Sequence, residues 1–194
     1  MTRAAKLPAT ARRQALLDAL MHIFLAEGFM SFTLDQLAER LHCSKSTLYT
    51  LARSKEQLAR AVIVHFFHRS ADAVEATVAA VDGLVEEYLE SVAEELRPAQ
   101  PPFYRDLDLF PPGREVYERN VALAAERVEQ LIAKGVAAGV YRSVNSEFVA
   151  DLIANALARI GRGEVGHLTG IDDSQAFQLL SDIVMGGLRI RPRS

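Results

Sequence analysis

The sequence predicts an all-α protein, and three observations support that fold class. Long stretches rich in Ala, Leu, Glu and Arg dominate the chain, while runs typical of β-strands are few. Apolar residues recur at helical spacing through most of the chain, and glycine or proline interrupts the spacing at intervals. Hydrophobic residues make up 49% and charged residues 24%, a composition typical of a globular protein with a buried core.

The first helix is expected over residues 10–27, because Leu17, Leu20 and Phe24 form one apolar face. Gly28 ends it, since glycine adopts the left-handed conformation at no steric cost. A basic arm leads into this helix. Its cationic residues are Arg3, Lys6, Arg12 and Arg13.

Residues 33–58 predict two short helices separated by a tight turn. Apolar residues of the first follow i, i+3, i+4, i+7 spacing: Leu34, Leu37, Ala38 and Leu41. Thr33 and Gln36 form a capping-box pattern before it, and the helical pattern breaks at His42. Ser44 can cap the second helix, which is small and rich in hydroxyl groups. Entry into a DNA major groove requires short donors and acceptors near a helix N-terminus, and this helix has them.

Two further helices follow before a proline-rich break. Ser54 caps a long helix expected over residues 55–80, and another is expected to end near Leu96. The segment 98–102 cannot continue a helix, because proline lacks an amide donor and clashes with the preceding turn. We expect residues 103–110 to form a short aromatic and acidic segment. The proline-bounded segment 98–112 as a whole is the best candidate for a pocket lid or entrance.

Three helices are expected in the rest of the chain. One begins near Pro112, which suits a first turn, and runs to about residue 138, where Gly139 ends it. A second runs from Asn145 or Ser146 to about residue 160. The last is expected over residues 173–188.

Positive charge is concentrated at the N-terminal end. Residues 1–60 hold nine Lys or Arg and five Asp or Glu, a net charge of +4. The remaining residues hold 13 Lys or Arg and 20 Asp or Glu, a net charge of −7, and the whole chain carries −3. A basic end on an acidic body is typical of a protein that places one end on phosphate.

Taken in order, the N-terminal motifs resemble the tetracycline-repressor (TetR) family of bacterial regulators. The resemblance covers about the first third of the chain, at Glu27-Gly28-Phe29, Thr33, Leu37-Ala38, Ser44, Thr47-Leu48-Tyr49, Ser54-Lys55-Glu56 and Leu58. The chain departs from the family pattern at three places. His42 and Ser46 stand where the family usually has glycine. Leu51 and Ala52 stand where it often has an aromatic residue or His followed by Phe, which removes one expected phosphate contact.

The resemblance implies a helix-turn-helix DNA-binding domain over residues 1–55 and a helical ligand-binding and dimerisation domain over residues 56–194. It implies a sequence-specific regulator of transcription, by default a repressor that a small molecule releases from a palindromic operator. Two alternatives stay open. One is an architectural DNA-binding protein of the same fold without an effector, and the other is a helical enzyme or carrier.

The expected DNA-binding residues lie at two helix N-termini and on the second motif helix. Free amides at a helix N-terminus bind phosphate, which favours Thr33 and Ser44. Lys45, Ser46 and Thr47 are candidates for contacts with base edges or nearby backbone. The resemblance implies phosphate contacts for Tyr49 and Lys55. The competing interpretation is that these residues are helix caps and solvated surface.

Large apolar residues of the body could line a small-molecule pocket. They are Phe66, Phe67, Tyr88, Phe103, Tyr104, Leu107, Phe110 and Tyr117. Pockets between helices are mostly apolar, although residues of this kind also form ordinary cores. The resemblance implies a homodimer that uses the last two helices. The expected interface residues are Val149, Leu152, Ile153, Ala156, Leu157, Ile160, Phe177, Leu180, Val184 and Leu188. The alternative is that both helices bury these faces inside one subunit.

Other functional classes find little support. The sequence has no phosphate-binding glycine loop, no nucleophile elbow and no His-Glu-x-x-His zinc motif, so we expect neither an enzyme nor a cofactor. His65 and His68 share a helical face but do not complete a metal site. Cys43 is the only cysteine, which excludes an internal disulfide and fits a reducing cytoplasm. No apolar run reaches the roughly 20 residues that span a bilayer, and no signal peptide is recognised.

Overall fold

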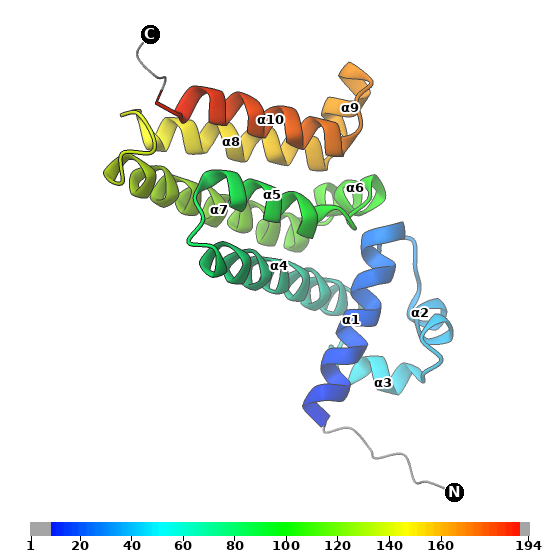
Figure 1. The fold of residues 1–194 in the computed structure, drawn as a ribbon. Coiled ribbons are helices and arrows are strands. Elements are labelled where there is room, and N and C mark those ends of the chain that lie inside the picture. Colours follow the sequence, from blue (N-terminus) through cyan, green and yellow to red (C-terminus); the bar gives the residue numbers. More distant parts are fainter. Residues whose placement is uncertain (1–8, 191–194) are drawn as a thin grey trace, which may run out of the picture.

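The computed structural model describes residues 9–190, and the regular elements in that range are helices (Figure 1). One isolated β-bridge joins Tyr141 to Arg189. The all-α prediction is therefore confirmed. Arg3 and Lys6 of the predicted basic arm lie outside the described residues. In chain order the helices are α1 (Ala9–Glu27), α2 (Leu34–Arg40), α3 (Lys45–Tyr49), α4 (Lys55–Ala80), α5 (Val85–Leu96), α6 (Pro101–Leu109), α7 (Pro111–Ala137), α8 (Ser146–Gly161), α9 (Glu164–Thr169) and α10 (Asp173–Leu188).

Helices α1, α2 and α3 form a small head at one end of the molecule (Figure 1). Leu37 of α2 and Leu48 of α3 are almost fully buried and belong to one core cluster with Leu20 and Phe24 of α1. Burying such side chains contributes roughly 1.5–3 kcal/mol each, so they hold the two short helices on α1. Cys43 lies half-buried in the turn, packed against the same cluster.

The remaining helices form the body, which is built in layers. Figure 1 shows α4 nearest the head, then α5 with α7, and then α8 with α10 at the far side. A second core cluster holds the far layers together, with Ile132 of α7, Ile153 of α8 and Leu188 of α10 almost fully buried. In the described part of the chain, no helix combines the length and apolarity needed to cross a membrane.

The core of the head continues into the near end of the body. Phe29, at the end of α1, makes an edge-to-face contact with Phe103 of α6, with ring centroids 6.2 Å apart. Phe103 in turn stands edge-on to Phe66 of α4 at 5.6 Å. Each such pair contributes about 0.5–1.5 kcal/mol beyond simple burial. The head is thus packed against α4 and α6 by one continuous aromatic cluster.

The sequence did not predict the helix that residues 103–109 form. They belong to helix α6, which begins at Pro101, and its Phe103 and Leu107 are buried. The physical reason is that proline is excluded from a helix interior but favoured in the first turn, where its missing amide is not needed. The same holds at Pro111, which opens α7 one residue earlier than expected. Helix α9 was also not predicted.

The turn between α2 and α3 contains backbone strain at His42. Its φ angle is +47°, in the left-handed region that glycine adopts readily and other residues avoid. This position is also where the chain departs from the glycine of the family pattern. A histidine there keeps the turn but raises its energy.

Replacing this residue, His42→Gly, should raise the free energy of unfolding by about 0.5–1 kcal/mol, because relief of left-handed strain exceeds the entropy that glycine adds to the unfolded chain. The measurement is a urea titration in which the midpoint rises at an unchanged slope. His22→Gly is the control, since His22 is exposed in the middle of α1, where glycine should lower stability by about 1 kcal/mol. Equal losses in the two variants would contradict the proposed strain.

Candidate DNA interface and ligand cavities

Helix α3 is positioned so that its two faces have different surroundings. Leu48 is 1% exposed and packs into the head core, whereas Tyr49 is 50% exposed on the outside. Ser46 also lies on the exposed face. Because one buried leucine fixes the helix, the polar face of α3 is free for an external partner.

Hydroxyl groups gather at the N-terminus of α3. The Ser44 hydroxyl accepts a hydrogen bond from the Thr47 backbone N–H at 3.2 Å, which confirms it as the helix cap. The same oxygen lies 2.6 Å from the Ser46 hydroxyl and 2.9 Å from the Thr47 hydroxyl. On α2, Thr33 and Gln36 form the reciprocal capping box expected from the sequence. Both helix starts are therefore ordered before any partner binds.

Lys45 is held in place by a neighbouring carboxylate. Its Nζ lies 2.7 Å from Asp35 Oδ1, and both side chains are largely exposed. The hydrogen bond to Asp35 is the main reason that the pKa of Lys45 is raised, so the ammonium stays charged. Exposed pairs of this kind contribute little stability. A phosphate could therefore replace Asp35 as the partner at small cost.

Lys55, a predicted DNA-binding residue, makes a contact within the fold. Its Nζ donates a hydrogen bond of 2.6 Å to the carbonyl of Met30, in the loop between α1 and α2. An ammonium group has three donors, so two remain for other partners. Lys55 is half-buried at the start of α4, while Thr33 and Tyr49 are exposed.

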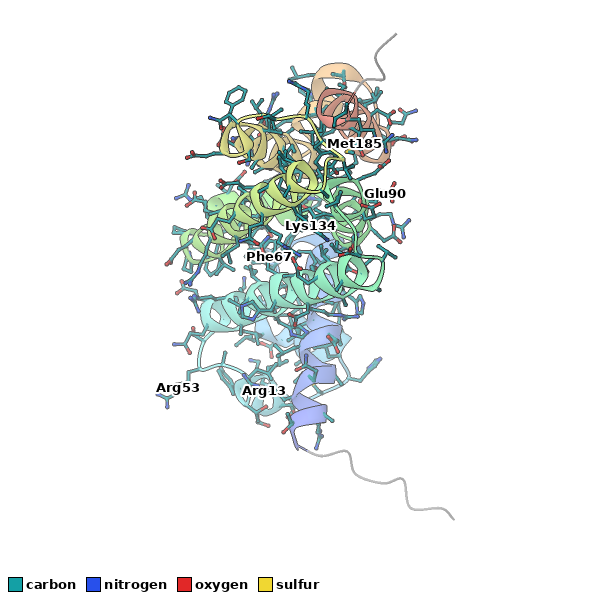
Figure 2. The ribbon with its side chains drawn as sticks, turned by 60° about the vertical axis from the view of Figure 1, so that its left-hand side comes forward. Arg13, Arg53, Phe67, Glu90, Lys134 and Met185 are labelled. Atoms are coloured by element: carbon teal, nitrogen blue, oxygen red, sulfur yellow. The ribbon has the colours of Figure 1, made fainter. Side chains whose placement is uncertain are left out.

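Two arginines near α3 were not included in the predicted DNA-binding set. Arg13 on α1 donates to the carbonyl of Thr50 at 3.0 Å and thus holds the end of α3. Arg53, between α3 and α4, is exposed. Figure 2 shows both side chains at the head end of the molecule, far from Met185 of α10. The concentration of positive charge in residues 1–60 was the signal that could have added them.

Asp106 of α6 anchors the end of α1. Its Oδ2 accepts hydrogen bonds from the backbone N–H groups of Phe29, at 2.5 Å, and Met30, at 2.7 Å. The backbone N–H of Gln100 donates to the carbonyl of Leu25 at 2.8 Å. Any side chain at Gly28 would place its Cβ only 2.6 Å from the Asp106 carboxylate. No local pattern in the sequence indicated this junction between head and body.

A second junction joins α1 to α4. His65 Nε2 lies 2.7 Å from Asp18 Oδ1, and Arg69 reaches the same oxygen at 3.2 Å. His68, by contrast, is exposed. Across the residues that the structure describes, no group of three or more His, Cys, Asp or Glu could hold a metal ion. The contact with Asp18 of α1 gives His65 a structural partner in the head.

The body contains a cavity of about 170 Å³ between α4, α5 and α7. Phe67 and Tyr88 line it, and Figure 2 shows Phe67 inside the body. Arg127 and Glu75 form a bidentate pair at its wall, with distances of 2.6 and 2.8 Å. Burial, followed by the nearby Glu75 charge, raises the pKa of Tyr88 to about 12, so its hydroxyl stays protonated. The cavity offers apolar walls with a few polar groups.

A larger cavity of about 490 Å³ lies between α5, the start of α6 and α10. Tyr104 lines this second cavity. The other predicted pocket residues line neither cavity and lie in or against the aromatic core beside the head: Phe66, Phe103, Leu107, Phe110 and Tyr117. For these five residues the core interpretation, which the sequence left open, agrees with the structure.

The predicted dimer residues divide between the two sides of α8 and α10. Four of them are buried within the subunit: Ile153, Leu157, Ile160 and Leu188. Five are half-buried: Val149, Ala156, Phe177, Leu180 and Val184. Leu152 alone among them is exposed. For these four residues, burial inside one subunit agrees with the alternative that the sequence left open, and the dimer interface itself stays a prediction.

Helices α8 and α10 also carry large apolar side chains that are exposed in the single chain. Phe148 and Leu152 lie four residues apart on α8, and Leu179 and Ile183 lie four apart on α10. All four are exposed, and Ile183 reaches 73%. We call this set the outer apolar face. Of these four residues, only Leu152 was among the predicted interface residues.

Residues 16–62 match the sequence model of a family described as bacterial regulatory proteins, tetR family. No curated protein matches the sequence. Among solved structures, a TetR-family transcriptional regulator from Cytophaga hutchinsonii aligns with a TM-score of 0.73 and 18% identity, over 96% of this chain and 100% of the other. A TetR regulator from Haloarcula marismortui gives 0.72 and 16%, over 93% and 100%. A transcriptional regulator from Saccharomonospora viridis in complex with choline gives 0.71 and 17%, over 95% and 100%.

Proposed function

We propose that this chain, a transcriptional regulator with a TetR-family DNA-binding domain on the fold of the TetR regulators, binds a palindromic DNA operator as a homodimer. We further propose that it is a repressor and that a small-molecule ligand releases it from DNA. Residues 1–55 would form the DNA-binding domain, and residues 56–194 would form the ligand-binding and dimerisation domain. The shared fold favours this role over that of a helical enzyme or carrier.

The observation that carries the proposal is the placement of α3. Its buried Leu48 fixes the helix on the head, while Ser46 and Tyr49 stay exposed and Lys45 has only a weak surface partner. In this arrangement the N-terminal part of α3 enters the major groove, where Lys45, Ser46 and Thr47 reach base edges or adjacent backbone. Thr33, Ser44, Tyr49 and Lys55 contact phosphates, which fix register on the duplex.

Dimerisation would use the outer apolar face. Large apolar side chains are exposed on α8 and α10, two helices that pack on each other, and exposed apolar area of this kind is typical of an interface. Regulators of this kind usually dimerise. A Cβ atom added at Gly186 or Gly187, beside Ile183 on α10, would meet no other atom within 4 Å, so a partner helix can approach closely there. A two-fold dimer places two copies of α3 about one DNA turn, roughly 34 Å, apart, which is the spacing of a palindrome.

The cavity between α4, α5 and α7 is the proposed effector site. It has apolar walls and a few polar groups, the usual character of a small-molecule site. The similar structure from Saccharomonospora viridis contains choline, which supports a small ligand for this fold. A ligand that prefers one spacing of the two heads would shift the population toward it. Helix α4 forms one wall of the cavity, and the N-terminus of α4 reaches the head. This helix therefore couples the effector cavity to the head.

Selection of bound genomic fragments with the purified protein tests this function. The selection is carried out at about 50 and about 200 mM salt, and we expect it to recover a short palindrome. Binding that depends on salt without a common motif would instead favour the architectural alternative, in which the head makes phosphate contacts alone.

Lys45→Ala should weaken binding to the recovered palindrome at least about tenfold and lower the salt slope by about two units. The reason is that each of the two subunits loses one cation that releases a counterion from DNA. The control is Arg119→Ala, because Arg119 is exposed on α7 of the body. Fluorescence anisotropy over a salt series measures both quantities. An effect of Arg119→Ala as large as that of Lys45→Ala would contradict the placement of DNA at α3.

A further inference from the structure

The larger cavity, between α5, the start of α6 and α10, is separate from the proposed effector site. Leu96 lines both cavities, so helix α5 is the wall between them. At about 490 Å³ it has the volume of a small-molecule site, whereas the cavity between α4, α5 and α7 has about 170 Å³. The larger space is therefore big enough to hold a small molecule of its own.

The floor and the rim of this cavity differ in chemistry. Leu89, Ala99 and Tyr104 are buried in the floor, and Phe177 of α10 forms a half-buried aromatic wall. The rim is acidic, with four carboxylates: Glu86, Glu90 and Glu94 of α5, and Asp182 of α10. An apolar floor under a negative rim suits a ligand that has both an apolar body and a positive charge.

Two of the four carboxylates already have basic partners. Arg97 pairs with Glu94, and Arg189 pairs with Glu86. Among the residues that the structure describes, no basic side chain forms an ion pair with Glu90 or Asp182. These two come from opposite walls, α5 and α10, and Figure 2 shows Glu90 on the outer side of the body. A cation bound in the cavity would compensate both charges.

We propose that the cavity between α5, α6 and α10 binds an amphipathic organic cation, with its apolar part on Leu89 and Phe177 and its charge between Glu90 and Asp182. The aromatic ring of Phe177 adds a cation–π contribution that a neutral ligand lacks. This site goes beyond the proposed function, because it lies on the opposite side of α5 from the effector cavity.

The site has a direct route to the head. Gln100 and Tyr104, at the start of α6, line the cavity. The Gln100 backbone N–H donates to Leu25 of α1, and Asp106 of the same helix holds Phe29. A ligand that contacts the start of α6 therefore contacts the helix that anchors α1. If a bound cation shifts the start of α6, it shifts the contacts that hold α1.

Calorimetric titration of the full-length protein without DNA tests the site. Three probes share one alkyl chain and differ in charge: octyltrimethylammonium, octanol and octanoate. We expect octyltrimethylammonium to bind once per chain and at least about tenfold more tightly than the other two, since an exposed ion pair contributes up to about fivefold and there are two carboxylates. Equal affinity for octanoate would overturn the proposal.

Variants locate the site. Glu90→Gln with Asp182→Asn should lower the affinity for octyltrimethylammonium about tenfold. Glu115→Gln with Glu126→Gln, which removes the same charge from exposed positions of α7, should leave it unchanged. Equal losses in the two double variants would show that net charge alone attracts the cation, and would overturn the site.

Filling each cavity in turn shows independently which of the two binds octyltrimethylammonium. Ala93→Phe fills the larger cavity and should remove binding, whereas Ala124→Phe fills the smaller one and should not. The opposite pattern would overturn the proposal. Thermal unfolding confirms that each variant folds. Because no DNA is present, a failure here leaves the DNA-binding proposal untouched, and failure to recover a palindrome leaves this site untouched.

Discussion

Replacing Ile183 with glutamate, Ile183→Glu, should convert the protein from a dimer to a monomer and weaken operator binding by at least about a hundredfold. Ile183 is 73% exposed in the single chain, so glutamate there does not disturb the subunit core. In a two-fold dimer the same residue enters the interface from both subunits, and two unpaired carboxylates are buried together. Burying a charge without a partner costs about 3–5 kcal/mol, and each 1.4 kcal/mol is a factor of about ten in the dissociation constant.

Sedimentation velocity measures the oligomeric state of this variant, and anisotropy with the recovered palindrome measures its affinity for DNA. Leu109→Glu is the matched control, because Leu109 is 64% exposed at the end of α6 and lies outside the outer apolar face. The control should remain dimeric and bind DNA as the wild type does. A dimeric Ile183→Glu protein at micromolar concentration would refute the proposed interface.

The outer apolar face illustrates what a sequence does not specify. Leu152 and Ile153 are adjacent and equally apolar, and both fit a helical stripe on α8. Ile153 is buried in the subunit and Leu152 is exposed because α8 packs on α7 through only one of its sides. Which side that is depends on where α7 lies, and α7 is a distant element whose position no local spacing encodes.

Features that depend on near neighbours were predicted well. The capping box of Thr33 and Gln36, the cap at Ser44 and the cap of α4 at Ser54 all join residues that are three apart. For the candidate interface, these signals identified the helix and its polar face. They could not show that Lys45 pairs with Asp35 or that Lys55 holds Met30, because those contacts depend on how α2, α3 and α4 pack.

The anchor at Asp106 is the clearest contact that only the structure reveals. It joins residues 77 positions apart, and an aspartate in a helix gives no sign of its acceptor role. Asp106 holds the segment that follows α1 through two hydrogen bonds. The start of the same helix, α6, also borders the larger cavity. Removing Asp106 should therefore affect both stability and the transmission of ligand binding.

In the variant Asp106→Ala, the free energy of unfolding should fall by about 2–3 kcal/mol. The substitution leaves the N–H groups of Phe29 and Met30 without their charged acceptor, and hydrogen bonds to charged groups contribute about 1.5–3 kcal/mol. The expected loss stays below the sum for two bonds because Met30 is exposed and water can replace the carboxylate there. Urea titration measures the loss. Asp108→Ala on the same helix is the control, since Asp108 is exposed and should change stability by less than about 0.5 kcal/mol.

The same variant separates a structural role from a coupling role. Asp106→Asn keeps one oxygen acceptor and should recover part of the stability, because a neutral acceptor forms a weaker bond than a carboxylate. If α6 transmits ligand binding to α1, Asp106→Ala should bind the operator in the absence of ligand yet respond less to octyltrimethylammonium, measured as the shift in the DNA dissociation constant. A full response in a destabilised Asp106→Ala protein would mean that the anchor only stabilises the fold, and that the signal reaches the head through α4 and the pairing of His65 with Asp18.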